Sequence, residues 1–218
     1  MKKLVLTFIL AVFLSGCIAN VRSDVTRFHT LGTNTAHKTF VVVPYEDQEG
    51  SLEFKAYAAV VAEKLSAFGY QLADSWENAD YAVFFQYGID NGTTVVSSNP
   101  IYGQTGGGTT YTSGSLNSLD GSATYSGTSY TSPSFGVVGT STSTKTVYRR
   151  RFTLNITDIK QSTQDNVVDV FQGKVTSDGS SNTFATVSDC LIDAMFKDFP
   201  GESGKTTTVN TLSGECKK

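Results

Sequence analysis

The pattern of apolar and polar positions in the first half of the chain predicts a strand, a helix and further strands. The run Thr39–Pro44 is β-branched and stops at a proline, which is typical of a buried strand. Ser51 can cap a helix whose apolar face repeats at a 3.6-residue period until Gly69 ends it. Residues 70–73 allow a short strand, and Tyr81–Ile89 alternate as a clearer one. The expected apolar face of the helix consists of Phe54, Ala58, Val61, Leu65 and Phe68.

A second set of periodic segments begins at Tyr148. Apolar residues at 152, 154 and 156 alternate with polar ones, which predicts a strand with one buried face and one solvent-exposed face. Residues 167–175 predict the returning strand, and Thr206–Val209 allow one more. Between these strands a second helix is expected, ended by Pro200 and Gly201, with the face Phe184, Val187, Leu191, Met195 and Phe199.

Residues 91–146 differ in composition from both halves. Of these 56 residues, 35 are Gly, Ser or Thr, and only Asp120 and Lys145 are charged. So little apolar surface does not offset the cost of ordering the chain. The segment is therefore expected to be a long, flexible loop inserted between two strands.

The order of these elements predicts an α+β fold. We expect a two-layer α/β sandwich over residues 39–200, with two helices on one face of a mostly antiparallel sheet and the loop insert at 91–146. Residues 17–38 are interpreted either as a tether or as an edge strand, because Val21–Phe28 alternate only weakly. Residues 201–218 are expected to form a polar C-terminal tail.

The first sixteen residues have the pattern of a signal peptide. Lys2 and Lys3 precede an apolar run, Leu4–Leu14, that is too short to span a bilayer. The tetrapeptide Leu14–Cys17 resembles the lipobox of bacterial lipoproteins, in which the chain is cut before the cysteine. The alternative is an ordinary secretory signal followed by a chance cysteine.

The resemblance to bacterial lipoproteins implies that Cys17 carries three acyl chains, palmitate among them. Two or more chains anchor a protein stably in a membrane. Ile18 follows Cys17, where lipoproteins of the inner membrane commonly have Asp, so the sequence favours an anchor in the outer membrane. The domain is then expected to face the periplasm.

The remaining cysteines, Cys190 and Cys216, form an even pair in an oxidising compartment. This predicts a disulfide, which would contribute about 3–4 kcal/mol by closing its loop. The alternative is a buried thiol at Cys190 and a loose one at Cys216.

Charge and residue counts exclude several classes of function. A formal net charge of −3 and a pI near 5.4 argue against nucleic acid as a partner. The two histidines, His29 and His37, have no nucleophile motif beside them, so no catalytic residue, metal ligand or cofactor is expected. The acidic run of Asp74, Glu77 and Asp80 lacks the ligand spacing of a calcium loop and is interpreted as solvated.

One further motif resembles a phosphate-binding loop without completing it. Gly201–Thr206 end in Gly-Lys-Thr, but position 199, where the motif requires glycine, is Phe199. We interpret the segment as a C-terminal turn.

Two groups of side chains are candidates for an interaction face. Strand alternation sends Arg149 and Arg151 to the wet face, where they can pair with lipid phosphate or acidic glycan. The tyrosines of the insert, Tyr102 and Tyr111 among them, can stack on sugar rings. The alternative is a solvated strand start and an unspecific loop.

Several short motifs, in this order, resemble small bacterial outer-membrane lipoproteins that carry a domain of unknown function. The resemblance implies a lipid-anchored envelope protein with an α/β sandwich, and it implies no catalytic residue. The motifs are Val21–His29, Thr39–Pro44 (TFVVVP), Ser51–Phe54, Tyr57–Ala58, Ala79–Tyr81, Thr153–Asp158 (with LNITD) and Met195–Gly201 (with FKDFPG).

The sequence thus predicts a non-enzymatic envelope lipoprotein that binds another envelope component, a protein or a glycan, or itself. Its oligomeric state stays open. One alternative is a subunit of an oligomeric outer-membrane pore or secretion assembly, with the insert as a hairpin through the membrane; residues 100–136 lack the alternation that such strands need. A second alternative is an envelope hydrolase that uses His29.

Overall fold

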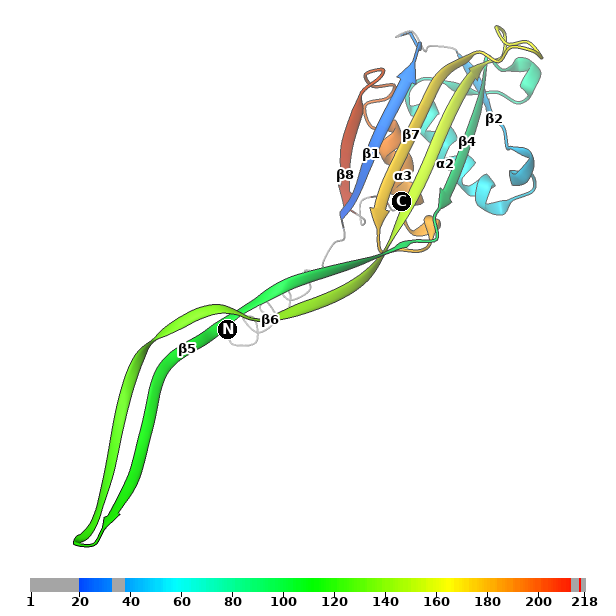
Figure 1. Ribbon diagram of the computed structural model, residues 1–218. Helices are drawn as coiled ribbons and strands as arrows, with labels where there is room; N and C mark the ends of the chain where they lie inside the picture. Colours follow the sequence, from blue (N-terminus) through cyan, green and yellow to red (C-terminus); the bar gives the residue numbers. More distant parts are fainter. Residues whose placement is uncertain (1–19, 33–37, 213–215, 217–218) are drawn as a thin grey trace, which may run out of the picture. The chain divides into compact units, whose positions relative to one another are not determined.

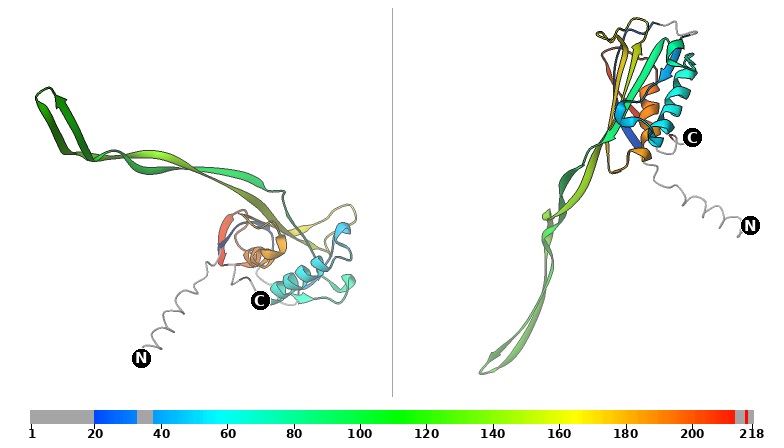
Figure 2. Two further views of the ribbon diagram at one scale, coloured as in Figure 1. Left: turned by 90° about the horizontal axis from the view of Figure 1, so that it is seen from below. Right: turned by 90° about the vertical axis from the view of Figure 1, so that its right-hand side faces the viewer.

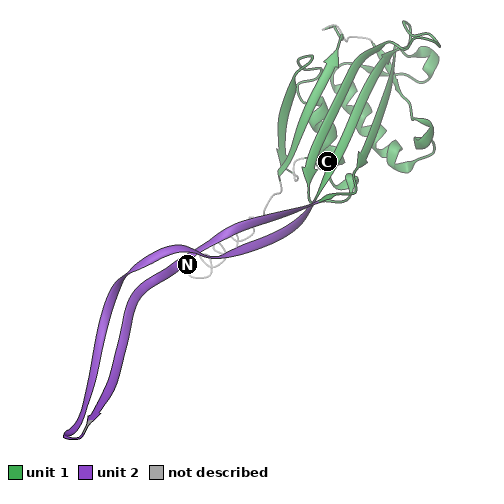
Figure 3. Cartoon of the chain, in the orientation of Figure 1, with its two compact units in different colours: residues 1–93, 147–218 green, residues 94–146 purple. Residues whose placement is uncertain are grey.

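The computed structural model describes residues 20–32, 38–212 and 216, and the chain divides into two compact units (Figure 1). Unit 1 is formed by residues 1–93 and 147–218, and unit 2 by residues 94–146 (Figure 3). Cys17 and the predicted cleavage site before it lie outside the described residues, as does His37.

The strands form one mixed sheet in the order β3-β2-β4-β6-β7-β1-β8, with β5 paired to β6. Pairing is antiparallel from β4 through β8, whereas β2 pairs in parallel with both β3 and β4. The α+β class is confirmed, and the sheet is antiparallel only in part. The strands are β1 (Asn20–His29), β2 (Thr39–Val42), β3 (Gln71–Leu72), β4 (Tyr81–Ile89), β5 (Thr93–Ser118), β6 (Gly121–Asp158), β7 (Asp169–Gly179) and β8 (Thr206–Leu212).

Helix α2 (Leu52–Ala67) begins where the sequence predicts it. The Ser51 hydroxyl accepts a hydrogen bond from the Phe54 amide at 3.1 Å, which satisfies one of the free amides of the first turn. The predicted apolar face packs inward, and the Phe54 ring stacks on Phe85 of β4 with centroids 4.7 Å apart. The helix is thereby fixed against the centre of the sheet.

Helix α3 (Ser188–Phe196) is shorter than the predicted apolar face. Phe184 lies in a preceding 3-10 turn, η3 (Phe184–Thr186), and Phe199 lies beyond the end of the helix. Asp193 of α3 pairs with Lys64 of α2 at 2.7 Å. Neither helix that the structure describes is long and apolar enough to cross a bilayer.

The predicted disulfide between Cys190 and Cys216 is present. The two Cα atoms lie 4.9 Å apart, and both residues are buried. The bridge fastens Cys216, near the C-terminus, to α3.

Both helices cover the same face of the sheet, and the core lies between the two layers (Figure 2). Burial of large apolar side chains supplies the main stabilisation of such a layered domain. No described helix covers the other face, which we call the open face. The largest fully buried side chains are Phe40, Phe85, Phe152, Phe171, Leu65, Leu154, Ile156, Leu191, Ile192, Met195, Val25 and Val61.

Strand β1 is neither the tether nor the edge strand that the sequence suggested. It lies between β7 and β8, so that Asp24 is opposite both Thr176 and Thr208. Its inward positions include the polar residues Ser23 and Arg27, and this mixture on the buried face weakened the alternation. The edges of the sheet of unit 1 are β3 and β8.

The prediction of a loop over residues 91–146 is wrong, because β5 and β6 pair with each other to form a long hairpin. Thr is β-branched and favours strands, so counting it with Gly and Ser as a loop residue underestimated the strand propensity. A hairpin also satisfies backbone hydrogen bonds across its two strands without needing a hydrophobic core.

Glycine within the hairpin allows close cross-strand contacts. A Cβ atom on Gly114 would lie 2.5 Å from the ring of Tyr125, so this ring lies against bare backbone. At Gly107, where φ is +78°, a Cβ would lie 2.3 Å from the Ser132 carbonyl oxygen. These positions require glycine because the partner strand occupies the space of a side chain.

Candidate functional site

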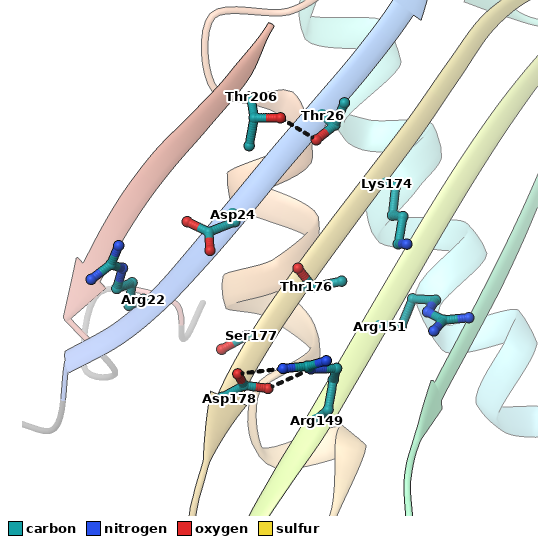
Figure 4. Close-up of a pocket in the computed structure, with 10 residues that line it drawn as sticks. All are labelled: Arg22, Asp24, Thr26, Arg149, Arg151, Lys174, Thr176, Ser177, Asp178 and Thr206. Carbon is teal, nitrogen blue, oxygen red and sulfur yellow. Dashed lines mark hydrogen bonds and ion pairs between the residues drawn. The ribbon is translucent and has the colours of Figure 1, made fainter.

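The open face of the sheet holds a hollow of about 520 Å³ that gathers positive charge from three strands (Figure 4). We call it the cationic hollow. Four of its residues are basic and two are acidic, although the whole chain is acidic. Its lining is Arg22, Asp24 and Thr26 of β1, Arg149 and Arg151 of β6, Lys174, Thr176, Ser177 and Asp178 of β7, and Thr206 of β8.

Strand register brings these residues together. Arg151 lies opposite Thr176 on β7, and Thr176 lies opposite Asp24 on β1. In the next row of the same face, Lys174 lies opposite Thr26. Side chains two residues apart on a strand share a face, so the alternation that buries Val25, Phe152 and Val175 turns this set outward.

Arg149 and Asp178 form a bidentate ion pair at one end of the hollow. The guanidinium donates from Nε to Oδ1 at 2.9 Å and from Nη2 to Oδ2 at 3.1 Å. This contact lowers the pKa of Asp178 and raises that of Arg149. Asp178 therefore stays ionised and neutralises one of the four cations.

The other cations of the hollow have no such partner. Among the described residues, no carboxylate lies within ion-pair distance of Arg22, Arg151 or Lys174. Arg151 and Lys174 are diagonal neighbours on β6 and β7, because Lys174 lies opposite Thr153. Diagonal positions lie about 7–8 Å apart, where like charges repel. An anion between them would remove that repulsion.

A second hollow of about 410 Å³ adjoins the first and shares Arg149 and Arg151 with it. Gly88 of β4 lies opposite Arg151, and a Cβ atom there would meet nothing within 4 Å. Because this position carries no side chain, the surface beside Arg151 stays open toward Gln86. The two hollows together extend across five strands, β4, β6, β7, β1 and β8.

Polar groups other than the cations also line the surface. The Asp24 carboxylate accepts a hydrogen bond from the Thr208 hydroxyl at 2.6 Å, and the hydroxyls of Thr26 and Thr206 lie 2.7 Å apart. Arginine and lysine bind carboxylate or phosphate, while carboxylates and hydroxyls bind hydroxyl groups. The set suits a ligand that carries both acidic groups and hydroxyl groups.

Arg150 and Arg27 differ from these cations because their side chains are buried on the helix side. Arg150 donates to the carbonyl and hydroxyl oxygens of Ser177, and burial lowers its pKa. Arg27 donates to carbonyl oxygens at the end of α3. Both are structural cations and do not belong to the candidate site.

The structure separates the residues that the sequence grouped as an interaction face. Arg149 and Arg151 lie on the open face, as strand alternation predicted, whereas Tyr102 and Tyr111 belong to unit 2 and are 73% and 82% exposed. Sequence reasoning missed Arg22 and Lys174. Their outward positions can be read from alternation, but the register of β7 with β6, which brings in Lys174, and the pairing of β1 with β7, which brings in Arg22, cannot.

His29 and the Gly201–Thr206 segment both make contacts within the fold. His29 Nε2 lies 3.0 Å from the Gly201 carbonyl oxygen, and Nδ1 has no hydrogen-bond partner among the described residues. Glu202 and Lys205 pair at 2.9 Å in the segment that leads into β8. The Gly201–Thr206 segment leads into strand β8, whereas a phosphate-binding loop would lead into a helix.

The prediction that the acidic run of residues 74–80 is solvated is wrong for Asp80. Asp80 is buried, accepts hydrogen bonds from the Thr39 amide and hydroxyl, and pairs with Lys160. These contacts lower its pKa to about 2. Asp80 joins the start of β2 to the start of β4.

No group of three or more metal-binding side chains is found among the described residues.

Comparison with known proteins identifies the family. Residues 24–201 match the family model described as a domain of unknown function, DUF4136, and the chain belongs to that family. The resemblance to a domain of unknown function is thereby confirmed. No curated protein matches the sequence.

Solved structures give only distant similarities. A PDZ domain protein from Parabacteroides distasonis is 13% identical with a TM-score of 0.45; the alignment covers 94% of this chain and 42% of that one. Two structures of the PelC dodecamer from Paraburkholderia phytofirmans are 15% and 16% identical with TM-scores of 0.36 and 0.35. They cover 79% of this chain and 92% and 93% of theirs.

Proposed function

We propose that this protein is a lipid-anchored, non-enzymatic binding module of the bacterial envelope whose open sheet face binds an acidic glycan. The observation that carries the proposal is the convergence of Arg22, Arg149, Arg151 and Lys174 in one hollow that contains only two carboxylates. Keeping three unpaired cations together has an electrostatic cost, which a bound anion would offset.

A glycan suits the lining of the site better than a lipid headgroup. A headgroup presents one compact phosphate, for which a few cations suffice. Here the cations alternate with Thr26, Thr176 and Thr206 and with the Asp24 carboxylate, which are partners for sugar hydroxyls. The neighbouring hollow beside Gly88 gives room for further sugar units along a chain.

The location of the protein rests on its sequence. Lys2 and Lys3, the short apolar run and Cys17 together support lipidation, and Ile18 supports sorting to the outer membrane. Mass spectrometry of the N-terminal peptide of the processed protein tests this part. We expect Cys17 as the first residue with three acyl chains, and an unmodified N-terminus would remove the anchor from the proposal.

Titration calorimetry with oligomers of a uronic acid tests binding at the open face. The wild-type protein is expected to bind them, more weakly as salt is raised because exposed charges are screened. Arg151→Gln and Lys174→Gln should each reduce the affinity by about tenfold, the value of one lost charge-assisted hydrogen bond.

Matched variants separate the site from general charge effects. Lys55 is an exposed residue of α2, on the helix side of the sheet. Lys55→Gln therefore makes the same charge change away from the open face and should leave the affinity unchanged. Gly88→Val adds a side chain where there is space, so it should leave stability unchanged while blocking the second hollow. Equal losses for Lys55→Gln and Arg151→Gln would contradict the site, as would binding to anionic lipid vesicles without binding to the glycan.

A further inference from the structure

The hairpin of unit 2 has two strand edges that lack a partner within the unit. Across residues 94–146, β5 and β6 have each other as their only strand partner among the described residues of unit 2. Each strand therefore uses one side of its backbone for pairing and leaves the other side without a strand. An isolated two-stranded hairpin is only marginally stable in water.

The usual protection against edge-to-edge pairing is sparse in this hairpin. Proteins guard long edges with lysines, prolines and inward-pointing charges. Unit 2 contains two charged residues, Asp120 and Lys145, and two prolines, Pro100 and Pro133. Long stretches of both strands thus carry unprotected backbone donors and acceptors.

The hairpin also carries exposed apolar side chains along both strands. Aromatic and β-branched side chains stabilise pairing with a neighbouring strand through cross-strand contacts. On β5 they are Val95, Val96, Ile101, Tyr102, Tyr111 and Leu116, and on β6 they are Tyr125, Tyr130, Phe135, Val137 and Val138.

From these observations we propose that the hairpin is an assembly arm that pairs, edge to edge, with the hairpin of a second copy of this chain. The β5 edge of one copy continues the antiparallel order when it adds to the β6 edge of the next. The two edges match in length because they belong to one hairpin. Each hairpin has only Asp120 and Lys145 as charged residues, so two hairpins do not repel each other. Each added copy leaves one β5 edge and one β6 edge free, so the contact is head-to-tail and closes as a ring or extends as a filament. This inference does not depend on glycan binding.

Native mass spectrometry of the full-length protein, released from the membrane in detergent, tests the proposal. The wild type is expected as a multiple of the single-chain mass. Tyr111→Lys with Tyr130→Lys places charges on side chains that are 82% and 71% exposed, and should shift the protein to single chains. Leu52→Lys with Leu72→Lys makes the same type of change at positions of unit 1 that are 80% and 59% exposed, and should leave the assembly intact.

Amide hydrogen exchange over residues 94–146 gives a second readout that needs no variant. In the assembly, amides on both sides of each strand should be protected, and dilution to single chains should release about half of them. Half of the amides exchanging fast at every concentration would overturn the proposal, as would a wild type that is always a single chain. Equal dissociation by the tyrosine and leucine variants, or insertion of single chains into lipid vesicles through the hairpin, would overturn it too.

Discussion

Arg149 and Asp178 lie directly opposite each other on β6 and β7 and form a two-point ion pair at one end of the cationic hollow. The pair has two consequences. It holds the Arg149 guanidinium in a fixed orientation, and it removes one positive charge from those available to a ligand. The hollow thus contains one neutralised cation beside three that have no carboxylate partner in the part of the chain that the structure describes.

Replacing Asp178 by Asn should increase the affinity for an acidic oligosaccharide. The change frees Arg149 and removes a carboxylate that repels the ligand, so we expect a gain of about threefold to tenfold. Titration calorimetry checks it. Asp165→Asn, an exposed position on the connection between β6 and β7, makes the same charge change outside the hollow. If both variants gain equally, net charge and not Arg149 governs binding.

The buried Arg27 should be essential for stability. Its guanidinium donates to the carbonyl oxygens of Ala194, Met195 and Lys197 at 2.8–3.1 Å, where α3 ends and its carbonyls lack helical partners. Arg27→Met leaves these groups unsatisfied and should lower the free energy of unfolding by about 3 kcal/mol. Urea unfolding measures this. Arg22→Met, an exposed position on the same strand, should change it by less than about 0.5 kcal/mol.

Local patterns predicted most elements of unit 1. The period of 3.6 and the Ser51 cap located α2, and strict alternation located β4 to the residue. Strand β1 was ambiguous because its buried face includes Ser23 and Arg27 while Phe28, on the other face, is apolar and exposed. A buried arginine whose partners are backbone carbonyls of a distant helix leaves no signal in the local pattern.

The site and the hairpin were less predictable because both depend on pairing between distant segments. Alternation placed Arg149 and Arg151 on the solvent-exposed face, but the register of β7 with β6 is needed to add Lys174, and the pairing of β1 with β7 is needed to add Arg22. For the insert, a composition that cannot build a core suggested a loop, yet paired strands rich in threonine need no core of their own. Cross-strand fits such as Gly114 with Tyr125 become visible only once the strands are aligned.

The contribution of Asp80 to stability should depend on pH. Its pKa is lowered from an ordinary value of 3.8 to about 2 in the folded state, so the ionised form stabilises the fold above about pH 4. This stabilisation is lost as the pH falls through 2. Asp80→Asn should therefore cost about 1–2 kcal/mol at pH 7, a value reduced by the exposure of Lys160, and much less at pH 2.

Urea unfolding of Asp80→Asn and wild type at the two pH values makes the comparison. Asp74 is an exposed carboxylate that, like Asp80, precedes β4. Asp74→Asn is therefore the matched control and should change the free energy of unfolding little at either pH. An equal cost of Asp80→Asn at pH 7 and pH 2 would show that the ionised carboxylate is not the stabilising form.

Breaking the disulfide should destabilise unit 1 without abolishing its secondary structure. Cys190 and Cys216 are 26 residues apart, and opening a loop of this size costs about 3–4 kcal/mol. Thermal unfolding of Cys190→Ser with Cys216→Ser, compared with wild type, measures the loss. An unchanged melting temperature would mean that the bridge adds nothing to the core around α3.

Nuclear magnetic resonance can show directly whether the open face binds acidic sugars. Titrating an acidic oligosaccharide into labelled protein should shift amide signals of residues 22–26, 149–153 and 174–178, whereas a neutral oligosaccharide of equal length should shift none of them. Signals that move instead on α2 and α3, or that respond equally to both sugars, would show that the open face is not the binding site for acidic sugars.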